Sequence, residues 1–151
     1  MTLKLPVSVL VVVHTAGGEV LLLERATRPG YWQSVTGSLE RPDETPAAAA
    51  IREVREETGI DAQSVELQGR LRPWNLAYTF EIYAQWRHRF APGTTHNTEH
   101  VFSLELPQRV QVTLAPDEHV ASLWLPWQAA AAKCFSWSNR DAIGMLSACA
   151  R

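Results

Sequence analysis

The stretch "REVREETGI", residues 52–60, places three glutamates close together near the end of a predicted helix. The preceding residues favour a helix over about 46–58, since Thr45 is a good N-cap and Pro46 suits the first helical position. Gly59 then stands where a glycine commonly ends a helix. The question is why one short helix should carry so much negative charge.

On a helix, Glu53, Glu56 and Glu57 have the spacing i, i+3, i+4 and therefore share one face. Arg52 and Arg55 are predicted to project from a separate basic sector. Like charges at these spacings destabilise a helix by about 0.2–0.5 kcal/mol per pair, and a divalent cation would reverse that effect. The alternative is a solvated charged face in which Arg52 pairs with Glu56.

The longer stretch "GSLERPDETPAAAAIREVREETGI", residues 37–60, resembles the Nudix box. That pattern reads Gly, five residues, Glu, seven residues, then Arg-Glu-apolar-x-Glu-Glu-x-Gly-apolar. Every position from Glu44 onward matches, but Gly37 stands one residue too early, so the loop is one residue longer. The resemblance implies an α/β/α sandwich with a mixed sheet. It also implies hydrolysis of a nucleoside diphosphate linked to another group, with Mg²⁺ as cofactor and Mn²⁺ as a substitute.

Length and composition fit a single domain over residues 1–151. The chain has 46% hydrophobic and 20% charged residues and a net charge of -2, as expected of a soluble globular protein. The absence of a basic excess argues against a nucleic-acid polymer or a membrane surface as partner. The start has no signal-peptide pattern, and Cys134 and Cys149 lack metal-site spacing, so we expect a cytoplasmic protein with idle thiols.

The rest of the chain predicts strands with a few helices, and hence an α/β fold. The apolar run at 7–13 indicates a strand buried on both faces, whereas alternation along 78–90 indicates a half-exposed strand. Further strands are expected at 19–25, 100–106 and 120–125, helices near 126–133 and 138–149, and loops at 28–44 and 91–99.

Segments outside the box resemble the branch of the Nudix family that acts on dihydroneopterin triphosphate in folate biosynthesis. They include "WRHRFAPG" and "SWSNR", which have no general catalytic meaning. This resemblance implies that Glu53 and Glu57 are the main metal ligands, that Glu56 is a ligand or base, and that Glu118 adds a metal contact. It places substrate contacts at Lys4, Arg25, Thr36, Phe80, Glu81, Ile82, Tyr83 and Ser136.

Several alternatives stay open from the sequence. Arg87, His88 and Arg89 could bind phosphate or form a solvated strand end. Trp32 and Trp137 are candidates for stacking on a flat heterocycle. The expected reaction releases pyrophosphate from dihydroneopterin triphosphate. A nucleoside or oxidised deoxynucleoside triphosphate is the alternative small-molecule substrate, and a non-catalytic nucleotide sensor is the alternative class, although a sensor need not keep every glutamate.

Overall fold

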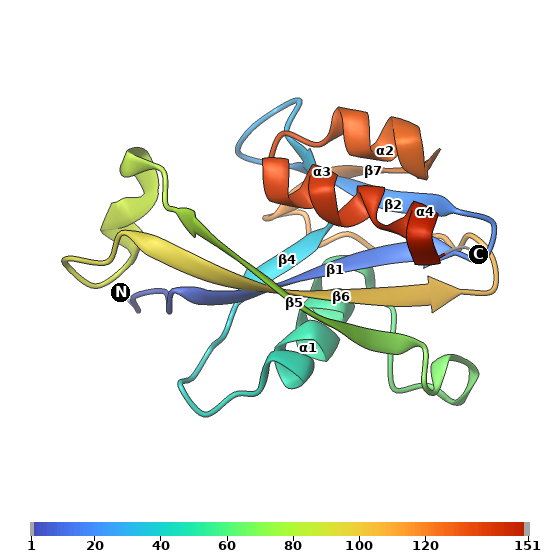
Figure 1. The fold of residues 1–151 in the computed structure, drawn as a ribbon, viewed down its shortest axis with the longest axis horizontal. Helices are drawn as coiled ribbons and strands as arrows, with labels where there is room; N and C mark the ends of the chain where they lie inside the picture. The colour runs from blue at the N-terminus through green and yellow to red at the C-terminus, as the bar shows by residue number, and fades with distance from the viewer. Residues whose placement is uncertain (1, 150–151) are drawn as a thin grey trace.

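The structure, a computed structural model, describes residues 2–149 and is built around one seven-stranded mixed sheet (Figure 1). Its main path has the order β3-β2-β1-β6-β5, with β4 paired to β1 and β7 paired to β2. Strands β1 and β6 are parallel, and the other pairs are antiparallel. The strands are β1 (Val7–Thr15), β2 (Glu19–Arg25), β3 (Trp32–Gln33), β4 (Val35–Ser38), β5 (Leu71–Glu81), β6 (His96–Leu106) and β7 (His119–Pro126).

Helices cover both faces of this sheet, as the predicted α/β/α sandwich requires (Figure 1). Helix α1 (Pro46–Thr58) packs on one face, where Val54 belongs to the same hydrophobic cluster as Val9 and Val11 of β1. Helices α2 (Trp127–Lys133), α3 (Trp137–Gly144) and α4 (Leu146–Cys149) cover the other. Strand β1 is apolar at successive positions because both of its faces are buried.

Helix α1 has the predicted bounds and ends. The Thr45 hydroxyl oxygen accepts a hydrogen bond from the Ala48 N–H at 3.1 Å, so the N-cap is made by a side chain. Pro46 occupies the first helical position. At the other end Gly59 has φ of 78°, a left-handed conformation that favours glycine, and its N–H donates to the Arg55 carbonyl.

The segment 28–44 is mostly loop, as predicted, and also holds the short strands β3 and β4. Several predicted bounds elsewhere were wrong. Strand β6 begins at His96, inside the expected loop at 91–99. Strand β5 starts earlier than predicted and ends at Glu81, after which the chain forms the 3₁₀ helix η2 (Ala84–Arg89). The alternation in sequence continues past this point, but the paired register of β5 and β6 ends at Glu81 and His96. A second 3₁₀ helix, η1, spans Val65–Leu67, and the helix expected at 138–149 divides into α3 and α4.

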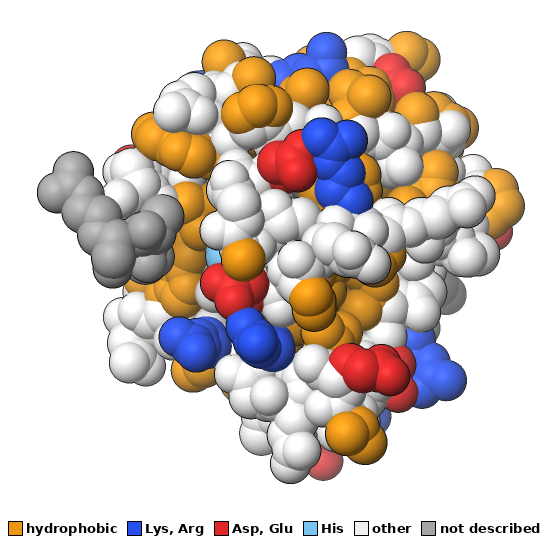
Figure 2. Space-filling model, turned by 90° about the vertical axis from the view of Figure 1, so that its right-hand side faces the viewer, with side chains coloured by type: hydrophobic (Ala, Val, Ile, Leu, Met, Phe, Trp, Pro, Cys, Tyr) orange, Lys and Arg blue, Asp and Glu red, His pale blue; other side chains and the backbone are white. Residues whose placement is uncertain are grey.

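The surface carries no dominant charge on the side shown in Figure 2, where basic and acidic side chains are scattered among uncharged ones. This distribution agrees with the small net charge of -2. Among the helices of residues 2–149, none combines the length and the apolar composition that a membrane span requires.

The thiol of Cys134 is free and buried, as expected of an idle cysteine. Burial raises the pKa of this thiol to about 12, so the unreactive protonated form dominates at neutral pH. The side chain of Cys149 lies outside the described residues.

Candidate active site

One cleft of about 830 Å³ is bordered by all the metal-binding and substrate-binding residues that the family resemblance implied. Helix α1, the segment before β7, η2, the end of β5 and the start of α3 all contribute to its lining. The predicted residues that border it are Lys4, Arg25, Thr36, Glu53, Glu56, Glu57, Phe80, Glu81, Ile82, Tyr83, Glu118 and Ser136. Their proximity is a property of the fold, and their individual roles remain predictions.

Within the acid face of α1, Glu53 and Glu57 are buried whereas Glu56 is exposed. Glu53 lies directly against Gly37 of β4, where an added Cβ atom would overlap its carboxylate. A side chain at position 37 would therefore force the Glu53 carboxylate to move. The extra residue relative to the Nudix pattern is accommodated in the loop that follows, where the Glu40 N–H donates to Glu44 Oε1 at 2.8 Å.

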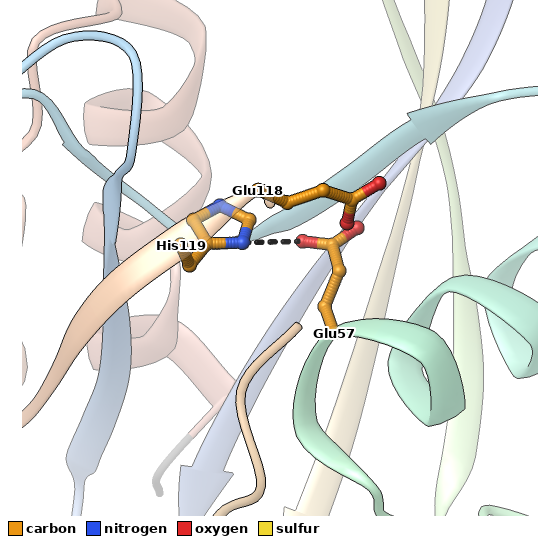
Figure 3. A group of neighbouring side chains, drawn as sticks. All are labelled: Glu57, Glu118 and His119. Atoms are coloured by element: carbon orange, nitrogen blue, oxygen red, sulfur yellow. Dashed lines mark ion pairs between the residues drawn. The ribbon is translucent and has the colours of Figure 1, made fainter. Parts of the chain in front are cut away.

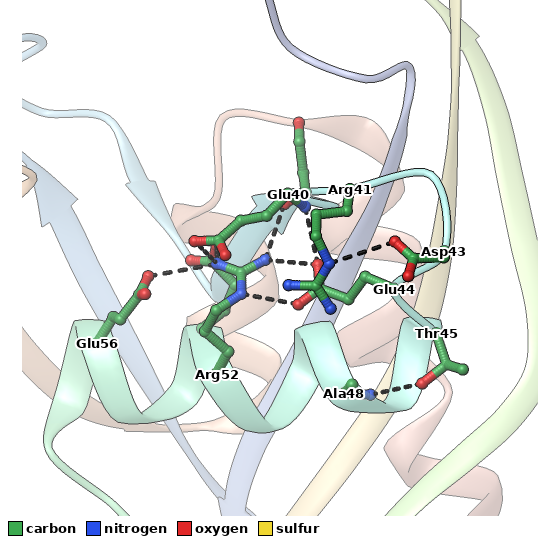
Figure 4. Close-up of polar contacts among 10 residues, drawn as sticks. Glu40, Arg41, Asp43, Glu44, Thr45, Ala48, Arg52 and Glu56 are labelled. Atoms are coloured by element: carbon green, nitrogen blue, oxygen red, sulfur yellow. Dashed lines mark hydrogen bonds and ion pairs between the residues drawn. The ribbon is translucent and has the colours of Figure 1, made fainter. Parts of the chain in front are cut away.

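Arg52 organises this end of the cleft (Figure 4). Its guanidinium donates to both oxygens of Glu44, at 2.9 and 3.0 Å, and to Glu53 Oε1 at 2.6 Å. It also donates to the Ser38 carbonyl at 3.1 Å. The prediction of a separate basic sector is wrong for Arg52, because the close approach of β4 places acceptors around it. The pairing with Glu56 exists, but at 3.4 Å it is one of the longer contacts.

These hydrogen bonds shift the pKa values of Glu44 and Arg52. Hydrogen bonds from Arg52 hold the pKa of Glu44 below its usual value, and those to Glu44 and Glu53 raise the pKa of Arg52. Glu44 is therefore ionised at neutral pH although it is only 7% exposed. The bidentate geometry is the one in which an Arg–carboxylate pair is strongest.

Glu57, Glu118 and His119 form a cluster that we call the acid group. Their ligand atoms lie within 4.8 Å of one another (Figure 3). Glu57 Oε1 and His119 Nδ1 are 3.8 Å apart, and both are buried without a hydrogen-bond partner. Burial raises the pKa of Glu57 well above its usual value and lowers that of His119 to about 4. A buried carboxylate oxygen without a partner, beside a second carboxylate and a neutral imidazole, fits a divalent cation.

His119 was missed by the sequence analysis. Its only signal is its place beside Glu118 in "PDEH", and a single histidine next to an acid is too common to indicate a ligand. Strand β7 begins at His119, and the pairing of β7 with β2 brings the imidazole over α1.

A cluster of cationic side chains borders the cleft beside the acid group. Burial and the neighbouring guanidinium of Arg89 lower the pKa values of both Lys4 and Arg25. The Arg25 guanidinium also stacks over the Trp86 ring, 5.3 Å from its centroid. Arg89 lines the cleft, whereas Arg87 is paired with Glu81. Of the two arginines, only Arg89 is therefore placed to meet a bound anion.

The remaining wall is aromatic and differs in detail from the prediction. Phe80, Glu81, Ile82 and Tyr83 all line the cleft, because the chain leaves the strand at Glu81 and no longer alternates between two faces. Trp137 borders the cleft and is half exposed. The prediction for Trp32 is wrong, since it is not among the cleft residues and packs under Lys133 and against the α2–α3 side of the core. Trp86 replaces it as a second tryptophan of the cleft and was not predicted.

The family model of the NUDIX domain matches residues 4–144 of the chain. The chain belongs to the Nudix hydrolase family. Among relatives of this Nudix hydrolase, the dihydroneopterin triphosphate diphosphatase of Escherichia coli (strain K12) is 48% identical over 141 residues, which cover 93% of this chain and 91% of that one. The Haemophilus influenzae protein of the same name is 39% identical, over 90% and 84% of the two chains.

The structural comparison agrees with the sequence comparison. The E. coli dihydroneopterin triphosphate pyrophosphohydrolase structure superposes on this Nudix hydrolase with a TM-score of 0.87. The two chains are 46% identical, and the match covers 96% of this chain and 97% of the other. The mixed sheet and the helices on its two faces are therefore common to both.

Proposed function

We propose that this Nudix hydrolase converts dihydroneopterin triphosphate to dihydroneopterin monophosphate and pyrophosphate, with Mg²⁺ as its cofactor. The observation that carries the proposal is the extent of the similarity: it spans 93% of the chain, and so includes the aromatic end of the cleft as well as the Nudix box. The box by itself is common to enzymes with many substrates and would support only the reaction class.

The acid end supplies the proposed metal site. Glu53, Glu57 and Glu118 would hold the cation, with His119 as a neighbouring nitrogen donor. A bound divalent cation neutralises phosphate charge and activates water. Because burial raises the pKa of Glu57, cation binding must also displace its proton at pH values near that pKa. Glu56 is more exposed, and it is a candidate for either a ligand or the base that accepts a proton from water.

The other residues would hold the substrate on either side of the reacting phosphates. Lys4 and Arg25 are proposed phosphate contacts because they are cationic, border the cleft and interact electrostatically with Glu118. Thr36 and Ser136 offer hydroxyls to the cleft, and the end of β5 forms its floor. The flat surfaces of the aromatic wall suit a heterocycle.

A product assay tests this function. Initial rates with Mg²⁺ would be measured on dihydroneopterin triphosphate, dATP, GTP and an oxidised deoxynucleoside triphosphate, with phosphate and pyrophosphate determined separately. We expect the catalytic efficiency on the pterin to exceed that on each nucleotide by about tenfold or more, since one misplaced polar contact costs about 1–3 kcal/mol. Pyrophosphate should be the released product.

Other outcomes would overturn the proposal in distinct ways. Equal or higher efficiency on a nucleotide would assign the enzyme to nucleotide triphosphates. Release of single phosphates would contradict the pyrophosphohydrolase reaction. Binding without turnover of any of these compounds would favour the nucleotide-sensing alternative.

A further inference from the structure

Glu99 is a buried carboxylate of the cleft that none of the proposed roles uses. It lies on β6, is 6% exposed and borders the cleft. The Ser138 hydroxyl donates to Glu99 Oε1 at 3.2 Å. Across the described residues, no lysine, arginine or histidine forms an ion pair with Glu99. A buried carboxylate without a cation is unfavourable unless other donors satisfy it.

The segments around Glu99 carry two aromatic side chains. Tyr78 is its register partner on β5, and the Tyr78 ring meets Trp137 edge-to-face with centroids 5.4 Å apart. Trp137 directly precedes Ser138, whose hydroxyl contacts the carboxylate. The carboxylate therefore stands close to the half-exposed Trp137 in the wall of the cleft.

Its chemistry suits a ligand that brings two N–H donors. An ionised carboxylate has two oxygens with about four lone-pair sites, and the hydroxyls of Ser138 and Thr36, which both favour the ionised form, leave the other sites available. Burial raises the pKa of Glu99 to about 7, so N–H donors that favour the ionised form would act on an equilibrium that is close to even at neutral pH. The geometry is that of a planar acceptor pair beside a planar hydrophobic surface.

We propose that Glu99 is a specificity-determining residue that accepts hydrogen bonds from the amino group and the adjacent ring N–H of the substrate's heterocycle. The identity of the heterocycle as a pterin rests on the proposed function. A pterin presents these two donors side by side, in the spacing that two carboxylate oxygens match. Guanine presents the same pair. Adenine presents one donor and one acceptor, which opposes a carboxylate.

Kinetics of the Glu99→Gln variant test this recognition. The amide keeps the shape but places a donor against one of the two N–H groups. We expect the catalytic efficiency to fall by about 10- to 100-fold on dihydroneopterin triphosphate and on dGTP, because a buried donor loses its partner. Efficiency on dATP should stay within about threefold of wild type or rise, since an amide can satisfy one donor and one acceptor.

Glu105→Gln is the matched control. It makes the same substitution on the same strand, at a residue that pairs with Arg70 and does not line the cleft. All three efficiencies should be unchanged in this variant. A thermal melt of both variants would establish that each is folded.

A wild-type measurement tests the proposal without any variant. Deoxyinosine triphosphate differs from dGTP only by the missing amino group, so its efficiency should be lower by about tenfold. Equal efficiency on dGTP and deoxyinosine triphosphate would overturn the role of Glu99. A Glu99→Gln effect of the same size on dATP as on dGTP, or no effect on either, would also overturn it.

The outcomes separate this proposal from the proposed function. If dihydroneopterin triphosphate is a poor substrate but dGTP is strongly preferred to deoxyinosine triphosphate, the pterin assignment fails and the role of Glu99 stands. The pterin could instead be the best substrate while dGTP and deoxyinosine triphosphate are used equally well and Glu99→Gln has no effect. In that case the function stands and the role of Glu99 fails.

Discussion

Two buried glutamates, Glu44 and Glu99, are stabilised in different ways. Glu44 is 7% exposed and receives two hydrogen bonds from Arg52, and its pKa is lowered. Glu99 is 6% exposed and receives a hydrogen bond from the Ser138 hydroxyl, and burial raises its pKa to about 7. The first charge is stabilised by the chain itself, whereas the second is left for a ligand to stabilise.

Glu57 resembles Glu99 more than Glu44, although it belongs to the same helix as Arg52. It is 1% exposed, its Oε1 has no hydrogen-bond partner, and its pKa is raised by burial. Arg52 stabilises the charge of Glu44, whereas Glu57 Oε1 has no hydrogen-bond partner within the described residues. Substitution of Glu57 should therefore lower activity, whereas loss of the Arg52 contact to Glu44 should lower stability.

The largest expected effect is on turnover in the Glu57→Gln variant. The amide keeps the side-chain shape but removes the charge that would hold the cation. We expect the rate to fall about 10³-fold or more, which corresponds to roughly 4 kcal/mol of transition-state stabilisation. Steady-state rates with Mg²⁺ measure the loss, and circular dichroism checks the fold. A natively folded variant with activity within a few-fold of wild type would show that Glu57 does not hold the metal.

Arg52→Gln should instead destabilise the protein. Removing the guanidinium leaves Glu44 and Glu53 buried without their cation, and breaking a buried ion pair in this way costs about 3–5 kcal/mol. Urea unfolding would measure the free-energy difference. Arg55→Gln is the matched control, because Arg55 is exposed on the same helix and should change stability by no more than about 0.5 kcal/mol. Similar losses in the two variants would show that the Arg52 network contributes little.

The features that the sequence predicted are those with local signals. Thr45, Pro46 and Gly59 set the ends of α1 within the helix itself, and the bounds were correct. The acid face follows from the helical spacing of its glutamates. Glu118 lies far from this helix in the sequence and was named only from the family resemblance, yet it borders the same cleft.

The features that were missed depend on contacts between distant segments. Arg52 faces the acids because β4 approaches α1 closely at Gly37, which no helical period reveals. The alternation along 78–90 indicated a strand, but the pairing of β5 ends at its last partner on β6. Glu99 and His119 are single polar residues in strands, and only the assembled sheet brings them to the cleft.

The uncompensated charge of Glu99 should also make stability depend on pH. A carboxyl group with a raised pKa in the folded state stabilises the fold most at low pH, where it is neutral in both states. That contribution is lost as the pH rises from the ordinary value of about 4.3 through the folded value of about 7. At pH 8 the metal-free wild type should therefore be less stable than Glu99→Gln by up to about 3 kcal/mol, compared with near equality at pH 4.

Urea unfolding of both proteins in chelator at the two pH values measures this difference. The Glu99→Gln variant is the reference for the wild type, because its amide does not titrate and all other titratable groups are the same in both proteins. A stability difference that is the same at both pH values would show that Glu99 is already compensated within the chain, as Glu44 is.

The smallest expected effect is the stabilisation of the folded protein by Mg²⁺. A cation that binds only the folded state adds about 2.7 kcal/mol at a hundredfold excess over its dissociation constant. The Glu53→Gln, Glu57→Gln double variant should lose most of that gain, because it removes the two buried carboxylates of α1. The Glu66→Gln, Glu105→Gln double variant removes two carboxylates that do not line the cleft, so it should keep the full gain. Melting temperatures with and without Mg²⁺ measure all three proteins. An equal rise in all three would place the cation outside the acid group, and Glu57 would then be a buried acid whose missing partner is not a metal.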